Sequence, residues 1–96
     1  MPILFTDHHL TDFGEWIQIF KSNPPPTVGN WHINRGVDDP NRVQLVAELD
    51  AVDVPEVEAF LNSDKMKTIF EQVNKISTQP IEFVWLENVN EACEFN

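Results

Sequence analysis

The chain has 96 residues, of which 42% are hydrophobic, and carries a formal net charge of -10. This length predicts one domain with a modest core. The chain has only six lysines and arginines, which are too few to neutralise many phosphates, so we expect binding neither to nucleic acid nor to anionic membrane surfaces. The sequence has no apolar run near the roughly 18 residues of a membrane span and no signal-peptide pattern, so we expect a soluble, cytoplasmic protein. The single cysteine, Cys93, excludes an intrachain disulfide and a thiolate zinc site.

Residues 2–10 predict a first strand, and residues 12–22 predict an amphipathic helix. In the strand, Ile3 and Phe5 point to one face, and the alternate residues point to the other. The alternate set is Leu4, Thr6 and His8. The helix has aromatic and aliphatic residues at helical spacing and an acidic cap at its start. Three consecutive prolines, 24–26, then block further helix.

Residues 29–50 predict a β-hairpin around the turn Asp38-Asp39-Pro40-Asn41. Pro40 lacks a backbone donor, and aspartate and asparagine bond to their own local backbone, so the turn cannot continue a strand. We expect strands at 30–37 and 42–50, with odd positions opposite odd positions, because a one-residue slip would bury polar side chains. The apolar odd set is Trp31, Ile33, Val43, Leu45 and Ala47. The even set is His32, Asn34, Gln44, Val46 and Glu48.

Residues 55–76 predict two short helices or one broken helix, and residues 81–88 predict the fourth strand. Pro55 fits the first turn of a helix, and Asn62-Ser63-Asp64 interrupts the apolar spacing. In the last strand, Ile81 is on the face shared with Phe83 and Trp85.

The predicted order is β-α-β-β-α-β, which is the ferredoxin-like arrangement of a four-stranded antiparallel sheet with helices on one face. We expect one such domain over residues 1–88 and an acidic tail over 89–96, whose Phe95 packs on a partner or frays. The uncovered sheet face is expected to be too apolar to remain wet, so we predict that a second copy covers it. Its apolar residues are predicted to be Leu4, Val46, Val84 and Leu86.

Two stretches of the sequence resemble a known family. The hairpin residues 35–43, RGVDDPNRV, lead into a strand ending AELD, and a helix containing AFLNS follows at 59–63. This pattern is similar to that of the antibiotic-biosynthesis-monooxygenase-like proteins. The resemblance runs over most of residues 1–88 and implies a dimeric α+β barrel with one pocket per subunit, between sheet and helices or inside the barrel.

The same family includes cofactor-independent oxygenases and haem-degrading enzymes. The resemblance implies that a haem enzyme needs a histidine on the long helix, and residues 54–76 contain none. We therefore predict no cofactor.

His32 and Glu48 are the candidate catalytic pair. They are expected opposite or diagonal to one another on the even face of the hairpin, where a carboxylate can tune a histidine as a general base. The alternative is a polar network at a dimer interface or a solvated patch. The candidate ligand-binding residues are Asn34, Gln44, Val46, Val84 and Leu86.

Other polar residues favour structural roles. His8 and His9 point to opposite faces of a strand and cannot hold one metal ion together, and Asp7 with His9 gives too few ligands. We predict no metal site. Arg35, on the apolar side, is expected to pair with a carboxylate.

Three functions remain open. The first is a homodimer that binds a small apolar or aromatic ligand. The second is a cofactor-independent monooxygenase or isomerase that acts on a small aromatic or carbonyl compound. The third is a protein-interaction module whose acidic surface binds a basic partner.

Overall fold

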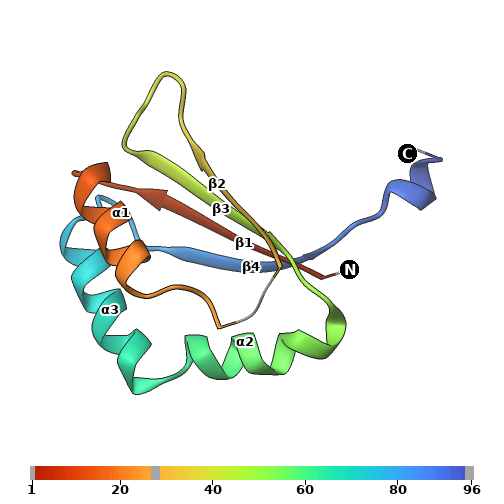
Figure 1. Ribbon diagram of the computed structural model, residues 1–96. Coiled ribbons are helices and arrows are strands. Elements are labelled where there is room, and N and C mark those ends of the chain that lie inside the picture. Colours follow the sequence, from red (N-terminus) through yellow and green to blue (C-terminus); the bar gives the residue numbers. More distant parts are fainter. Residues whose placement is uncertain (1, 27–28, 95–96) are drawn as a thin grey trace.

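The computed structural model describes residues 2–26 and 29–94 (Figure 1). Its order of strands and helices confirms the predicted β-α-β-β-α-β arrangement, with the second helical segment divided in two. The elements are β1 (Pro2–His9), α1 (Phe13–Ser22), β2 (Asn30–Arg35), β3 (Arg42–Glu48), α2 (Val54–Leu61), α3 (Asp64–Lys75) and β4 (Glu82–Glu87). Two short 3₁₀ turns, η1 (Ala51–Asp53) and η2 (Asn90–Cys93), follow β3 and β4.

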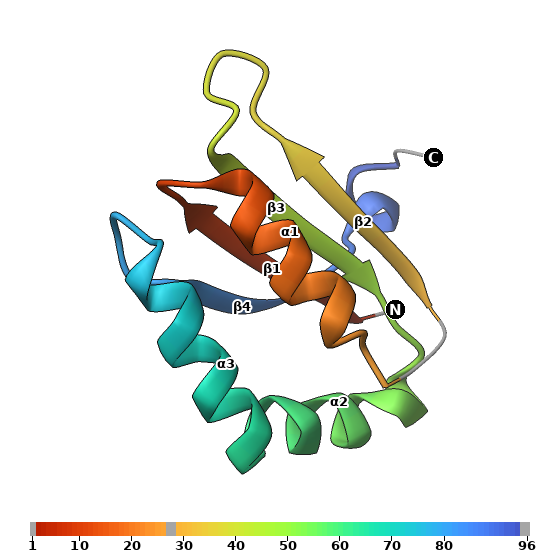
Figure 2. The same cartoon turned by 60° about the vertical axis from the view of Figure 1, so that its left-hand side comes forward.

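The four strands form one antiparallel sheet in the order β2-β3-β1-β4. This order is that of the ferredoxin-like fold, which confirms the predicted fold class. All three α-helices lie on one side of the sheet, and the other side carries no helix (Figure 2). We call these the helix-covered face and the outer face. None of the helices in residues 2–26 and 29–94 combines the length and apolar character that a membrane span requires.

Helices α1 and α3 begin where the sequence supplies a capping side chain. The Asp12 Oδ1 atom accepts a hydrogen bond from the backbone N–H of Glu15 at 3.1 Å, which starts α1. The helical segment after β3 stops at Leu61 and restarts at Asp64. Ser63 causes the restart, because its Oγ accepts from the N–H of Met66 at 3.2 Å. The helical layer therefore changes direction between α2 and α3 (Figure 2).

The hairpin between β2 and β3 closes as the turn residues predict. The N–H of Asn41 donates to Asp39 Oδ1 at 3.0 Å, and the N–H of Gly36 donates to the carbonyl of Arg42 at 2.8 Å. A Cβ at Gly36 would collide with the Asp39 carbonyl oxygen, so this close approach requires glycine. The side-chain oxygen of Asn41 accepts from the N–H of Phe13 at 3.0 Å, which joins the turn to the start of α1.

The strand register confirms the odd-to-odd pairing of the hairpin. Trp31 lies opposite Ala47, and Ile33 lies opposite Leu45. Val43 and Ala47 have no measurable exposure, so the odd face of β3 is part of the core. The even face of both strands belongs to the outer face, as expected.

The expected position of Leu4 on the outer face is wrong. Leu4 lies opposite Ala47 and is 1% exposed, so it belongs to the core beneath the helices. Thr6 and His8 share its face, and Ile3 and Phe5 occupy the outer face instead. Strand β1 is central and apolar on both sides, so alternation alone does not show which side meets the helices.

The core consists of two clusters. One lies between α1, α3 and the adjacent ends of β1 and β3, and it includes Trp16, Val43 and Ile69. The other lies under α2 and includes Leu4 and Val57. Since protein interiors are otherwise close-packed, the boundary between two clusters is where a void is expected.

The segment after β4 leaves the body of the domain. It carries η2 outward from the end of the sheet (Figure 1), and its residues are exposed. Cys93 in η2 is a free, exposed thiol. The expectation for Phe95 lies outside the described residues.

Candidate functional site

A cavity of about 90 Å³ lies between the helix-covered face of the sheet and the three helices. Its lining is almost wholly apolar, and the residues of the lining that carry polar atoms in their side chains are Thr6, His8, Asn23 and two tryptophans. The volume is below that of a roughly 150 Å³ engineered cavity that binds benzene. A small ligand fits with little adjustment, whereas a larger one requires the lining to move.

The cavity occupies the boundary between the two core clusters. Leu4 and Val57 of one cluster line it, as do Trp16 and Ile69 of the other. Part of its wall consists of phenylalanine rings that are only half-buried, such as Phe60. The change of direction between α2 and α3 separates the clusters, so the void follows from the Ser63 break in the helical layer.

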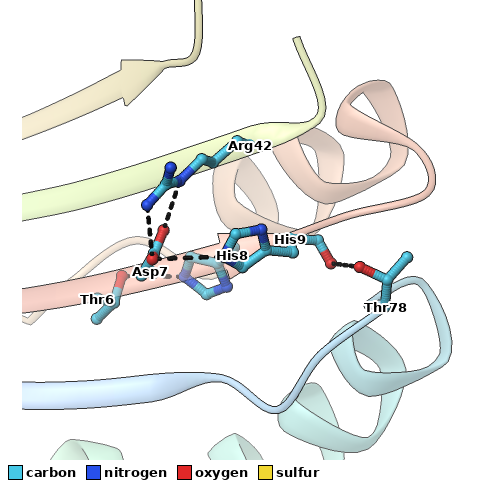
Figure 3. A network of polar contacts seen from close by, with 6 residues as sticks. All are labelled: Thr6, Asp7, His8, His9, Arg42 and Thr78. Atoms are coloured by element: carbon cyan, nitrogen blue, oxygen red, sulfur yellow. Dashed lines mark hydrogen bonds and ion pairs between the residues drawn. The ribbon is translucent and has the colours of Figure 1, made fainter. Parts of the chain in front are cut away.

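His8 is the one ionisable residue in the described lining of the cavity. It is 6% exposed, and its ring lies 5.3 Å from that of Trp16, between centroids. Its Nε2 atom lies 2.9 Å from the Thr6 hydroxyl oxygen (Figure 3). Its Nδ1 atom is buried and has no hydrogen-bond partner among the described residues. A buried polar atom without a partner is uncommon and needs an explanation.

Burial lowers the pKa of His8 from 6.5 to about 4, because the interior disfavours the charged ring. The charge of Asp7 raises this pKa, and His9 lowers it, but both effects are smaller than that of burial. The elements that pack around the ring contribute apolar side chains such as Trp16 and Val43. His8 is therefore a neutral hydrogen-bonding group at pH 7.

A second buried polar atom belongs to a residue of the cavity wall. Trp31 lines the cavity, and its Nε1 atom is buried with no partner in the part of the chain that the structure describes. Trp31 lies opposite Ala47, whereas His8 lies opposite Val43. The two groups are therefore at different ends of the sheet and not side by side.

The outer side of β1 carries a separate polar network (Figure 3). The Arg42 guanidinium lies 3.3 Å from the Asp7 carboxylate, and His9 Nε2 lies 3.4 Å from the same carboxylate. Burial raises the pKa of Asp7, but the hydrogen bond and charge of Arg42, together with His9, bring it below 3.8. His8 and His9 point to opposite faces, as predicted, and residues 2–26 and 29–94 contain no group of three metal-binding side chains.

The predicted catalytic pair lies on the outer face. His32 is opposite Val46 and diagonal to Glu48, and both members of the pair are exposed. Among the described residues, no hydrogen bond or ion pair joins them. Their catalytic role remains a prediction.

The predicted ligand-binding residues are also on the outer face, so none of them lines the cavity. Asn34 and Gln44 lie opposite one another and, with Arg42, help to line a second, polar pocket of about 180 Å³. Val84 and Leu86 are on β4, opposite Phe5 and Ile3 respectively. Val46 lies on the other side of Phe5. Their role in binding remains a prediction.

The expectation for Arg35 is wrong. Its Nε donates to the Pro40 carbonyl at 2.6 Å, and its guanidinium lies 4.0 Å above the centre of the Phe13 ring. No carboxylate pairs with it in the described part of the chain. The aromatic ring and the turn carbonyl satisfy this cation instead.

Comparison with known proteins supports the fold. No family profile and no curated protein matches the sequence. Among solved structures, a conserved protein from Methanosarcina mazei matches with a TM-score of 0.72 and 12% identity, over 92% of both chains. A candidate antibiotic biosynthesis monooxygenase from Deinococcus radiodurans matches with a TM-score of 0.70 and 8% identity, over 93% of both. An antibiotic biosynthesis monooxygenase matches with a TM-score of 0.67 and 10% identity, over 93% of this chain and 99% of its own.

The chain has the fold of the antibiotic-biosynthesis-monooxygenase-like proteins. The predicted resemblance is therefore confirmed at the level of the fold. Identities of 8–12% establish architecture and carry no residue role from one protein to another.

Proposed function

We propose that this protein is a homodimer that binds a small, uncharged, apolar ligand in the cavity between its sheet and its helices. The observation that carries this proposal is an apolar cavity with a neutral, buried histidine whose Nδ1 atom has no partner in the described residues. Ligand sites are typically apolar hollows with a few convergent polar groups.

The lining sets the expected affinity. Burial of apolar surface contributes about 0.8 kcal/mol per methylene, so a six-carbon ligand gains roughly 5 kcal/mol. Loss of the ligand's translational freedom offsets part of that gain. We therefore expect minimal probes such as benzene to bind with dissociation constants near the millimolar range, about -4 kcal/mol.

Benzene titration observed by methyl NMR tests the cavity. We expect shifts for the methyl groups of Leu4, Val57 and Ile69, which line it. Val57→Phe places a ring in the cavity and is expected to abolish these shifts, whereas Val52→Phe, at a position 82% exposed, is a matched control that leaves them. A folded Val57→Phe variant with undiminished shifts contradicts the proposed site.

The proposed partner is a second copy of the chain, seated on the outer face. Phe5 lies between Val46 and Val84 in the register, and Ile3 lies opposite Leu86, so the apolar side chains are contiguous. Val84 and Leu86 are 39% and 45% exposed, which is a large apolar surface for a small domain. A second sheet packed on this face removes it from water.

Light scattering tests the dimer. Val84→Lys is expected to give a monomer at micromolar concentration, because a buried ammonium opposes association. Val37→Lys, at a turn position 98% exposed, is the matched control and is expected to remain dimeric. A monomeric unmodified protein contradicts the proposed dimer.

The second candidate function is cofactor-independent oxygenation or isomerisation of a small aromatic or carbonyl compound. The names of two structural neighbours favour it. In this proposal His32 and Glu48 exchange protons with the substrate, and the even-face residues Asn34 and Gln44 orient it. Oxygen consumption with a panel of small phenols tests this proposal. If turnover is unchanged in His32→Ala, His32 is not the catalytic base.

A further inference from the structure

Buried side chains close the cavity below and above. Below it is the sheet, whose central strands β1 and β3 are joined by backbone hydrogen bonds, so a ligand does not pass between them. The buried lining residues of these two strands are Leu4, Thr6, His8 and Leu45. The buried lining residues of the helices above are Trp16, Val57, Met66, Ile69 and Val73. Since such packing leaves no passage, a ligand enters where the lining residues are less buried.

The lining reaches both edge strands of the sheet, β2 and β4, and it is less buried at β4. At β2 the lining residue is Trp31, which is half-buried and packs against the buried cluster under α2. At β4 the lining residue is Phe83, which is 40% exposed. Every other lining residue within residues 2–26 and 29–94 is buried or half-buried. The edge at β4 is therefore where the cavity lies nearest to water.

The side chain of Phe83 lies between the cavity and that edge. Phe83 is opposite Thr6 in the register, so its side chain is on the helix-covered face. Its ring meets the ring of Phe70, on α3, at 5.2 Å between centroids and an angle of 64°. Both residues line the cavity, and no described strand lies beyond β4. The pair therefore closes the cavity between α3 and β4.

Phe83 is also the aromatic residue of the lining that can move at the smallest cost. In the described part of the chain, its ring contacts one other aromatic ring, that of Phe70. The ring of Trp16, by contrast, is buried and contacts the rings of His8, Phe13 and Phe20. Exposed side chains change rotamer rapidly, whereas a buried ring must displace its neighbours.

We propose that small apolar ligands enter and leave the cavity at the β4 edge, between α3 and β4, and that the Phe83 ring is the gate of this passage. This inference rests on the proposed function, since it assumes that the cavity binds a small molecule. Phe70 is a positioning residue, because its contact holds the Phe83 ring in the closed arrangement.

A gate has a kinetic signature that an ordinary lining residue lacks. A ring that must swing aside for both entry and exit slows association and dissociation by the same factor, so it leaves the dissociation constant unchanged. A residue that only contacts the ligand acts mainly on the dissociation rate. The two roles are therefore separated by the association rate constant.

Benzene exchange, measured from NMR line shapes of the Leu4 and Ile69 methyl groups during a titration, tests the gate. Phe83→Ala is expected to raise the association and dissociation rate constants by about tenfold or more, with a change in the dissociation constant of only about threefold. Trp85→Ala is the matched control. Trp85 is an aromatic residue on the same face of β4 and is 36% exposed, but it does not line the cavity, so both rate constants are expected to stay unchanged.

Phe83→Trp provides the opposite change, because it enlarges the ring at the edge. We expect both rate constants to fall. If Phe83→Ala raises only the dissociation rate constant, or if Trp85→Ala accelerates exchange equally, the gate is wrong and the cavity remains a binding site. If benzene does not shift the methyl resonances of the unmodified protein at millimolar concentration, the proposed function itself fails.

Discussion

The burial of His8 predicts that the domain loses stability in mild acid. In the folded chain the pKa of His8 is about 4, whereas in the unfolded chain it returns to about 6.5. Between these two values the unfolded state binds a proton that the folded state does not. The free energy of unfolding therefore falls as the pH is lowered through this window, and its dependence on His8 fades as the pH rises above 6.5.

The size of the effect follows from the same two pKa values. They differ by about 2.5 pH units, and each unit corresponds to about 1.36 kcal/mol, so the full loss is about 3 kcal/mol. Solvent screening does not reduce this free energy, because His8 is only 6% exposed. The steepest slope is about 1.2 kcal/mol per pH unit, near the middle of the window, where the two states differ by about 0.9 of a proton. The lowered pKa of Asp7 adds a separate loss only below pH 3.8.

Urea unfolding at pH values from 4.5 to 7.5, followed by tryptophan fluorescence, measures this slope. The protein concentration is held constant, because association contributes to stability. His8→Asn removes the titrating ring and is expected to flatten the curve. His32→Asn retains His8 and is expected to keep the slope of the unmodified protein. Parallel curves for the unmodified protein and His8→Asn refute the assigned burial of His8.

Three further predictions concern the turns that position the cavity. Ser63→Ala removes the cap of α3 and is expected to lower the free energy of unfolding by about 1 kcal/mol, measured by urea unfolding. The matched change Ser22→Ala, at an exposed hydroxyl, is expected to have a smaller effect. Equal losses of stability in the two variants would contradict the role of the cap. Asn41→Ala leaves the N–H of Phe13 without its acceptor and is expected to cost about 1–3 kcal/mol in the same assay, whereas an unchanged midpoint would show that the link is not stabilising. Gly36→Ala forces its Cβ against the Asp39 carbonyl and is expected to shift hairpin amide resonances in NMR spectra, so an unshifted spectrum would show that the turn has room.

Much of the fold is predictable because turn-forming and helix-capping residues mark where strands and helices end and begin. The turn around Pro40 and the break at Ser63 each combine a residue that cannot extend an element with a side chain that caps the next one. The register of β2 and β3 also follows from the sequence, since only one pairing puts Trp31 and Ala47 on the same buried face.

The family resemblance implies a pocket between sheet and helices, but the residues that line the candidate cavity were not predictable from the sequence. Its central residue, His8, shares a face with Leu4, but β1 is apolar on both sides, so its alternation allowed either face to meet the helices. The expected outer position of Leu4 also places His8 on the outer face, together with His32. The two-residue spacing of Leu4, Thr6 and His8 does place all three on one face of β1. Only the pairing of β1 with β3 shows that this face is the one beneath the helices.

Strand β4 lies at an edge of the sheet, with β1 on one side and an unpaired backbone on the other. Its sequence has four consecutive apolar residues between Glu82 and Glu87, and every residue of it is exposed. Such an edge can add strands from other molecules and start aggregation, and charged flanking residues oppose this by repulsion. Each end of this edge therefore depends on one carboxylate for its protection against added strands.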